Sequence, residues 1–131
     1  MNRFTSFLLL ATLALLAITG CASLDPAGPY AGDKVLYDAD GAIASSYELM
    51  HAFVKWEYER RTALKDVPAI TTYADYIRAN SKQWIRSAIA MRDAYAASPT
   101  KDPAELYRAL AVLREAATQS AQYLLIATQT P

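Results

Sequence analysis

The stretch that decides the fold is residues 102–128, "DPAELYRALAVLREAATQSAQYLLIAT". It opens with Asp102, Pro103 and, two positions later, Glu105, an order that is typical of the first turn of a helix. The residues that follow place apolar or small side chains at every third or fourth position, which is one face of a helix. They are Leu106, Leu110, Leu113, Ala117, Ser120, Leu124 and Ala127. The sequence therefore predicts an amphipathic helix over about 103–129.

Two earlier segments, about 33–65 and about 68–97, have the same periodicity. Pro68 and Pro99 separate the three segments, because a proline disfavours helical geometry in the residue before it. In the first segment, the face expected to be buried carries Leu36, Ala39, Ile43, Tyr47, Met50, Val54 and Tyr58, and Phe53 widens it. In the second segment, that face carries Ile70, Tyr73, Ile77, Trp84, Ala88, Met91 and Tyr95.

The first helix has two possible starts. Ser45 and Glu48 form a potential capping box, and Gly41 costs about 1 kcal/mol inside a helix, so a start near Ser45 is one possibility. The other is a start near Asp33. We favour the earlier start, because the apolar residues between the two positions are in phase with those that follow.

The three predicted helices are similar in length, about 45, 45 and 40 Å at 1.5 Å per residue. Short connections between helices of matched length make sequential neighbours antiparallel. A chain of 131 residues is long enough for one domain. We therefore expect an all-α fold, an antiparallel up-down-up three-helix bundle over 33–131.

Residues 1–20 differ from the rest of the chain. Arg3 precedes an apolar run, residues 7–18, in which Thr12 is the one polar residue. The run is shorter than the roughly 20 residues of a membrane-spanning helix and has the length of a signal-peptide apolar region. It ends in Ile18-Thr19-Gly20-Cys21, and this cysteine is the only one in the chain.

This ending resembles the lipobox of bacterial lipoproteins, a resemblance that covers about the first 21 residues. It implies that the signal peptide is cleaved between Gly20 and Cys21, and that a diacylglycerol on the Cys21 thiol and a palmitate-like acyl chain on the new amine hold the protein to a membrane. Ala22, where Asp would favour the inner membrane, points to the periplasmic side of the outer membrane. The alternative is an uncleaved anchor in which Cys21 is a small apolar residue.

Residues 21–32 contain two prolines and two glycines and little periodic apolar character, which predicts a flexible tether. A tether of this length spans somewhat under about 20 Å, so the bundle is expected close to the membrane. Because the cysteine is single, no intramolecular disulfide is expected.

Charge and composition disfavour several functions. Arg3 is the one basic residue of the predicted signal peptide, so the remainder has twelve basic and thirteen acidic side chains and no net field that would attract nucleic acid. His51 is the single histidine and has no other histidine or available cysteine as a co-ligand, so we expect a surface residue, no metal site and no cofactor.

The paired carboxylates do not predict catalysis either. Asp38 and Asp40, and likewise Glu57 and Glu59, are two residues apart and so project from different sides of a helix. We expect solvated charges, with Glu57 paired to Arg60 or Arg61, and no enzymatic activity.

The segment "HAFVKWEYERR", residues 51–61, is the richest in residue types that dominate binding interfaces. Its candidate partner-binding residues are Phe53, Trp56, Tyr58, Arg60 and Arg61. In the alternative interpretation, Trp56 packs beneath the third helix and the arginines are solvated. Ile85, Ile89, Val112 and Leu125 lie off the predicted stripes and form either an uncovered partner or self-association surface or part of a broad core.

These features favour a lipid-anchored, periplasm-facing interaction or structural module that binds an envelope protein or itself. The alternative is a cell-wall enzyme or enzyme regulator acting through the Trp56 region. A small prophage-type lysis accessory is a further possibility that only the chain length suggests.

Overall fold

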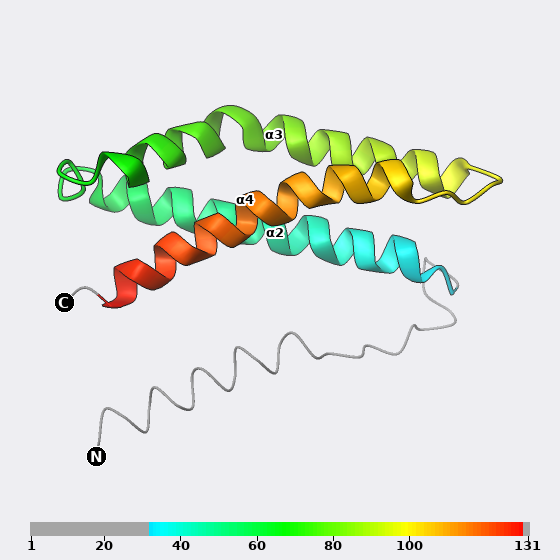
Figure 1. The fold of residues 1–131 in the computed structure, drawn as a ribbon, viewed down its shortest axis with the longest axis horizontal. Helices are drawn as coiled ribbons and strands as arrows, with labels where there is room; N and C mark the ends of the chain where they lie inside the picture. Colours follow the sequence, from blue (N-terminus) through cyan, green and yellow to red (C-terminus); the bar gives the residue numbers. More distant parts are fainter. Residues whose placement is uncertain (1–31, 130–131) are drawn as a thin grey trace, which may run out of the picture. The chain divides into compact units, whose positions relative to one another are not determined.

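The computed structural model describes residues 32–129, and three helices make up nearly all of this part of the chain. Helix α2 spans Lys34–Arg60, α3 spans Pro68–Ala97 and α4 spans Ala104–Gln129. The chain direction reverses at each connection (Figure 1), and each helix packs on the other two. The predicted all-α, up-down-up three-helix bundle is thereby confirmed. The predicted signal peptide, Cys21 and residues 22–31 of the predicted tether lie outside the described residues.

The start of α2 is set by Asp33. Its carboxylate accepts hydrogen bonds from the backbone N–H groups of Val35 at 3.1 Å and Leu36 at 3.3 Å, which would otherwise have no partner in the first turn. The helix then continues without a break through Gly41 and Ser45. The earlier of the two predicted starts is therefore correct.

The helix expected over 33–65 ends earlier, at Arg60, and residues 61–66 form turns. The Leu64 N–H still donates to the Arg60 carbonyl at 3.0 Å, and the Leu64 side chain packs against the core. The turns lead the chain to Pro68, the first residue of α3, where the missing N–H of proline costs no hydrogen bond.

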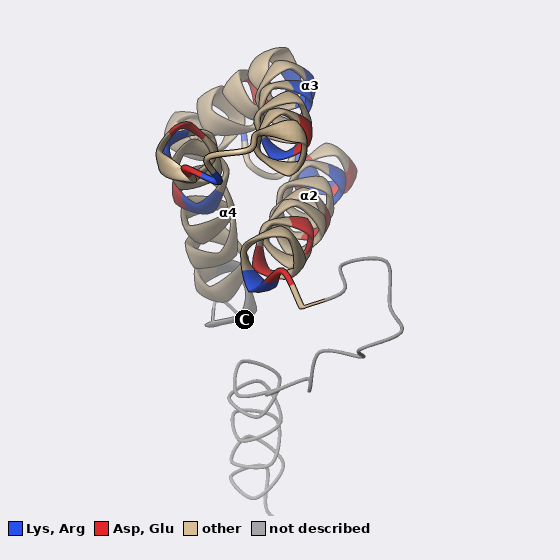
Figure 2. Ribbon diagram, turned by 90° about the vertical axis from the view of Figure 1, so that its right-hand side faces the viewer, with Lys and Arg blue, Asp and Glu red and all other residues tan. Residues whose placement is uncertain are grey.

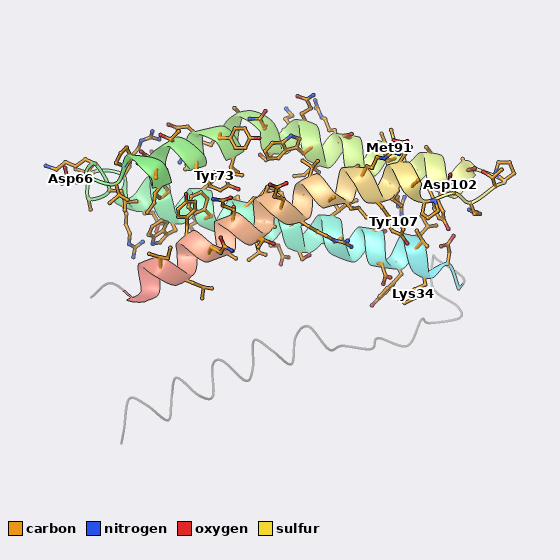
Figure 3. All side chains as sticks on the ribbon, in the orientation of Figure 1. Lys34, Asp66, Tyr73, Met91, Asp102 and Tyr107 are labelled. Carbon is orange, nitrogen blue, oxygen red and sulfur yellow. The ribbon has the colours of Figure 1, made fainter. Side chains whose placement is uncertain are left out.

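The connection between α3 and α4 lies at the opposite end of the bundle, as the positions of Asp66 and Asp102 show (Figure 3). The Lys101 ammonium donates to the Ala96 carbonyl at 2.8 Å and so satisfies an acceptor at the end of α3. The Asp102 carboxylate accepts from the Ala104 N–H at 3.0 Å, which is the capping interaction expected for this acid.

The core runs along the axis of the bundle and combines branched apolar residues with alanines that let the helices approach closely. Its buried apolar members are Ala39, Met50, Phe53, Ile70, Ala74, Ile77, Ala88, Tyr95, Leu106, Leu110, Leu113, Ala116 and Ala117. Ser120, on the predicted face of α4, is fully buried, and its hydroxyl donates to the Ala116 carbonyl at 2.8 Å.

The buried face of α2 differs from the predicted one. Tyr47 and Tyr58 were expected inside but are 52% and 75% exposed, whereas Ser46 and Glu57 are buried. The buried side chains of α2 are Ala39, Ser46, Met50, Phe53 and Glu57. Ala39, Met50 and Phe53 are buried as predicted, but the buried face is displaced toward Ser46 and Glu57. Phe53 occupies its centre, and Arg78 of α3 pairs with Glu57.

Candidate functional site

The five residues predicted to bind a partner do not form one patch. Phe53 is fully buried, with its ring centroid 5.6 Å from that of Tyr73 and 5.5 Å from that of Tyr123. Phe53 is thus a core residue, as its place beside the predicted buried stripe indicates, and it offers no exposed surface to a partner. A phenylalanine at the centre of three helices removes far more apolar area from water than it could at a surface, and this decides its position.

Trp56 is half-buried, packs against the core and lies with its ring centroid 6.2 Å from that of Phe53. The Arg60 guanidinium carbon lies 5.8 Å from the Trp56 ring centroid, within cation–π range. Tyr58 follows Trp56 by two residues, so it projects about 160° away around the helix. Trp56 and Tyr58 consequently belong to different surfaces of the bundle.

Arg61 joins an ion-pair network between α2 and α3, built around the fully buried Glu57. The Arg78 guanidinium donates to Glu57 Oε2 and, at 3.3 Å, to the Val54 carbonyl. Glu57 Oε1 has no hydrogen-bond partner, and its charge is balanced by Arg61 Nε at 3.7 Å. Glu57 was expected to be solvated; pairing with Arg78 and Arg61 is what makes its burial tolerable.

Asp75 completes this network by bridging both arginines. It accepts two hydrogen bonds from Arg61, at 2.9 and 2.6 Å, and one from Arg78 at 2.7 Å. These bonds, the one from Arg61 foremost, lower the pKa of Asp75, and the bond to Asp75, followed by the charge of Glu57, raises the pKa of Arg61.

A second inter-helix ion pair lies nearer the start of α2. Arg92 on α3 donates to both carboxylate oxygens of Asp40, each at 3.0 Å, and also to Asp93 at 2.7 Å. Asp38 instead pairs with Lys34 on the surface of α2. The two aspartates therefore face different partners, as their spacing predicts.

Between these two ion-pair clusters, α2 and α3 form an open groove of about 180 Å³, which we call the α2–α3 groove. Its lining consists of Tyr47, Met50, His51, Val54, Ile77, Arg78 and Ser81. The exposed rings of Tyr47 and His51 stack with their centroids 5.7 Å apart along one edge. His51 is thus a surface residue, as expected, but it belongs to a groove that the sequence did not reveal.

The opposite side of α3 carries an aromatic cluster. Tyr73, Tyr123 and Phe53 lie with ring centroids 5.3–5.6 Å apart, and the Tyr73 hydroxyl donates to the Ala116 carbonyl at 3.0 Å. Burial raises the pKa of Tyr73. Figure 3 places Tyr73 on the side of α3 that faces the other helices.

Next to this cluster, α3 and α4 form a second groove of about 170 Å³, which we call the α3–α4 groove. Its lining consists of Tyr73, Tyr76, Trp84, Val112, Glu115, Ala116 and Gln119. Sequence reasoning missed Tyr76, Glu115 and Gln119, because only the packing of α3 on α4 brings them together.

The four off-stripe apolar residues differ in exposure. Ile89, Val112 and Leu125 are 43%, 44% and 61% exposed, and Ile85 packs against the core. Lys and Arg are interspersed with Asp and Glu on all three helices (Figure 2), so charge does not mark one face of the bundle.

Within residues 32–129, no three histidine, cysteine or carboxylate side chains gather where they could hold a metal ion. None of the helices in this part of the chain is long and apolar enough to cross a membrane. Comparisons with protein-family models, curated proteins and solved structures find no match to the chain.

Proposed function

We propose that this protein is a lipid-anchored, periplasm-facing interaction module of the cell envelope, and that its α2–α3 groove binds an amphipathic helix of an envelope protein. The observation that carries this proposal is the groove itself. Val54 is a partly exposed apolar side chain in it, above the buried Met50 and Ile77, and the exposed rings of Tyr47 and His51 border it.

The groove is open and lies between two packed helices, which favours a third helix as its occupant. A cleft between two packed helices accepts the apolar face of another, as in helix-in-groove recognition. The ion pairs at both ends leave the apolar stretch between them as the contact surface, and Tyr58 lies beyond it, exposed for contact. Tyrosine and arginine are enriched in binding hot spots, which supports a protein partner.

An enzymatic role through the Trp56 region finds less support. Of the two carboxylates beside Trp56, Glu57 is buried and bonded to Arg78, which leaves the exposed Glu59 without a second carboxylate to act with it. The Trp56 ring already packs against the Phe53 ring and the Arg60 guanidinium. We therefore propose binding without catalysis.

The proposed anchor is a lipid on Cys21, which the lipobox resemblance supports. Two or three acyl chains make membrane association stable, because one chain alone binds only marginally. Ala22 supports the outer membrane as the proposed location. The tether proposed for residues 21–32 keeps the groove within reach of membrane-associated partners.

In-cell photo-crosslinking tests the groove. A photoreactive amino acid at His51 is compared with one at Arg114, an exposed position on α4 outside both grooves. We expect an adduct from position 51 whose crosslinked peptide is an amphipathic helix of an envelope protein, and loss of that adduct on Val54→Asp. Equal adducts at both positions, none at 51, or an adduct with a second copy of this chain would contradict the proposal.

The anchor has its own test. Metabolic labelling with a palmitate analogue and membrane fractionation are carried out on the wild-type chain and on Cys21→Ser. We expect label and outer-membrane recovery for the wild type only. An amino-terminal mass that retains residues 1–20, or an unmodified thiol, would refute the lipid anchor while leaving the groove proposal to its own experiment.

A further inference from the structure

The α3–α4 groove combines three aromatic rings with one carboxylate. It lies on the other side of α3 from the α2–α3 groove. Tyr76 is 53% exposed, and its ring centroid lies 5.3 Å from that of Trp84 at an interplanar angle of 61°. The Tyr73 ring centroid lies 6.1 Å from that of Tyr76. The three rings therefore border one space from different directions.

This aromatic wall is held in place by the core. Tyr73 packs against Phe53 and Tyr123 and is bonded through its hydroxyl to the Ala116 carbonyl. Because Tyr73 contacts Tyr76, and Tyr76 contacts Trp84, the wall needs little rearrangement to receive a ligand.

The charge of the groove is not balanced. Glu115 and Gln119 lie one turn apart on α4, and within residues 32–129 neither side chain forms a hydrogen bond or an ion pair. None of the seven lining residues is a lysine or an arginine, so Glu115 leaves a net charge of −1 at the groove. Glu115 lines the same groove as the rings of Tyr73, Tyr76 and Trp84, which places its carboxylate near them.

We propose that the α3–α4 groove binds an organic ammonium group, such as an alkylammonium or quaternary ammonium cation. Ring faces carry negative quadrupole density and attract a cation, and this attraction increases when the site is partly desolvated. The Glu115 carboxylate adds a direct charge interaction, and the Gln119 carbonyl can accept a hydrogen bond from an N–H donor. A volume of about 170 Å³ suits a small cationic group rather than a drug-sized ligand.

The ammonium group has two chemical sources, a lipid headgroup and a lysine side chain. The test titrates choline and Nα-acetyl-lysine separately into the full chain carrying Trp56→Phe, which leaves Trp84 as the only tryptophan reporter. Trp84 fluorescence gives the dissociation constant. The neutral isostere 3,3-dimethylbutanol has the shape of choline without its charge and serves as the ligand control.

We expect saturable binding of at least one ammonium probe and none of the neutral isostere. Tyr76→Ala and Glu115→Gln are each expected to weaken it by about threefold to thirtyfold. The matched controls are Tyr107→Ala, a similarly exposed tyrosine outside the groove, and Glu48→Gln, an exposed carboxylate on α2; both should keep the wild-type affinity. Circular dichroism verifies that each variant is folded.

The same titrations distinguish the two sources of the ammonium group. Tighter binding of choline indicates a lipid headgroup, and tighter binding of the lysine derivative indicates a protein side chain. Binding of 3,3-dimethylbutanol as tight as that of choline would overturn the proposal, because the groove would then recognise shape alone. Absence of saturable binding by both ammonium probes, or full affinity in the folded Glu115→Gln variant, would also overturn it.

Discussion

The burial of Glu57 makes Arg78 the most consequential charged residue for stability. Replacing Arg78 with methionine keeps the aliphatic stem but removes the guanidinium that donates to Glu57 Oε2. Glu57 would then be fully buried with only Arg61 Nε, at 3.7 Å, near one of its oxygens. The substitution thus tests whether the ion pair is what allows a carboxylate in this core.

The expected magnitude follows from the geometry. Removing one partner of a fully buried ion pair costs about 3–5 kcal/mol. The Arg78 side chain is 29% exposed and Arg61 remains nearby, so the cost of Arg78→Met should fall below that range, at about 2–3 kcal/mol. For a bundle of this size, that loss lowers the Tm by roughly 10–20 °C.

Chemical denaturation monitored by circular dichroism measures the free energy of unfolding of each variant. Arg86→Met is the matched control, because Arg86 is an exposed arginine of the same helix, and we expect a change within about 0.5 kcal/mol. The double variant Glu57→Met with Arg78→Met should be more stable than Arg78→Met alone, since no buried charge remains unpaired. A loss below about 1 kcal/mol for Arg78→Met, or a double variant less stable than Arg78→Met, would refute this reasoning.

Three further predictions concern the core, a helix end and acid stability. In urea denaturation, Phe53→Ala should lower the free energy of unfolding by about 3–5 kcal/mol, and Tyr58→Ala should change it by less than about 0.5 kcal/mol. Equal losses would contradict the assignment of Phe53 to the core and Tyr58 to the surface. Asp33→Ala should cost about 1 kcal/mol and speed amide exchange at the start of α2; unchanged exchange there would argue against the cap. The pKa of Asp75 is lowered in the folded state, so its stabilising contribution is present above its ordinary value of 3.8 and is lost as the pH falls through the folded value. Asp75→Asn should therefore lose less stability than the wild type between about pH 5 and pH 2, and an identical acid loss in both proteins would show that Asp75 does not contribute in this way.

The helix starts could be predicted because their signals act over a few residues. Asp33, Asp102 and Pro68 each act on backbone groups within one turn, and each lies at the start of a helix in the structure. The end of α2 was predicted less well, since the turns after Arg60 depend on where Leu64 packs against other helices.

How the candidate binding residues are distributed around α2 could not be predicted for a related reason. The segment 51–61 looks like one patch in the sequence, but a helix turns by about 100° per residue and distributes its side chains around the axis. Phe53 faces the core, Trp56 packs beside it, and Tyr58 and Arg61 face other directions. Neither groove could be found from the sequence, because each is lined by two helices whose contacts are long-range.

By itself, the sequence determined that the chain forms three helices, where each of them begins, and that sequential helices run in opposite directions. Periodicity, capping acids and prolines carry that information locally. Tertiary structure alone decided that Glu57 belongs to the buried face of α2. Glu57 is strongly polar, and its inward position depends on Arg78, which is 21 residues away on α3. The free energy of burying a charge is set by the partner that meets it, and that partner exists only once the helices have packed.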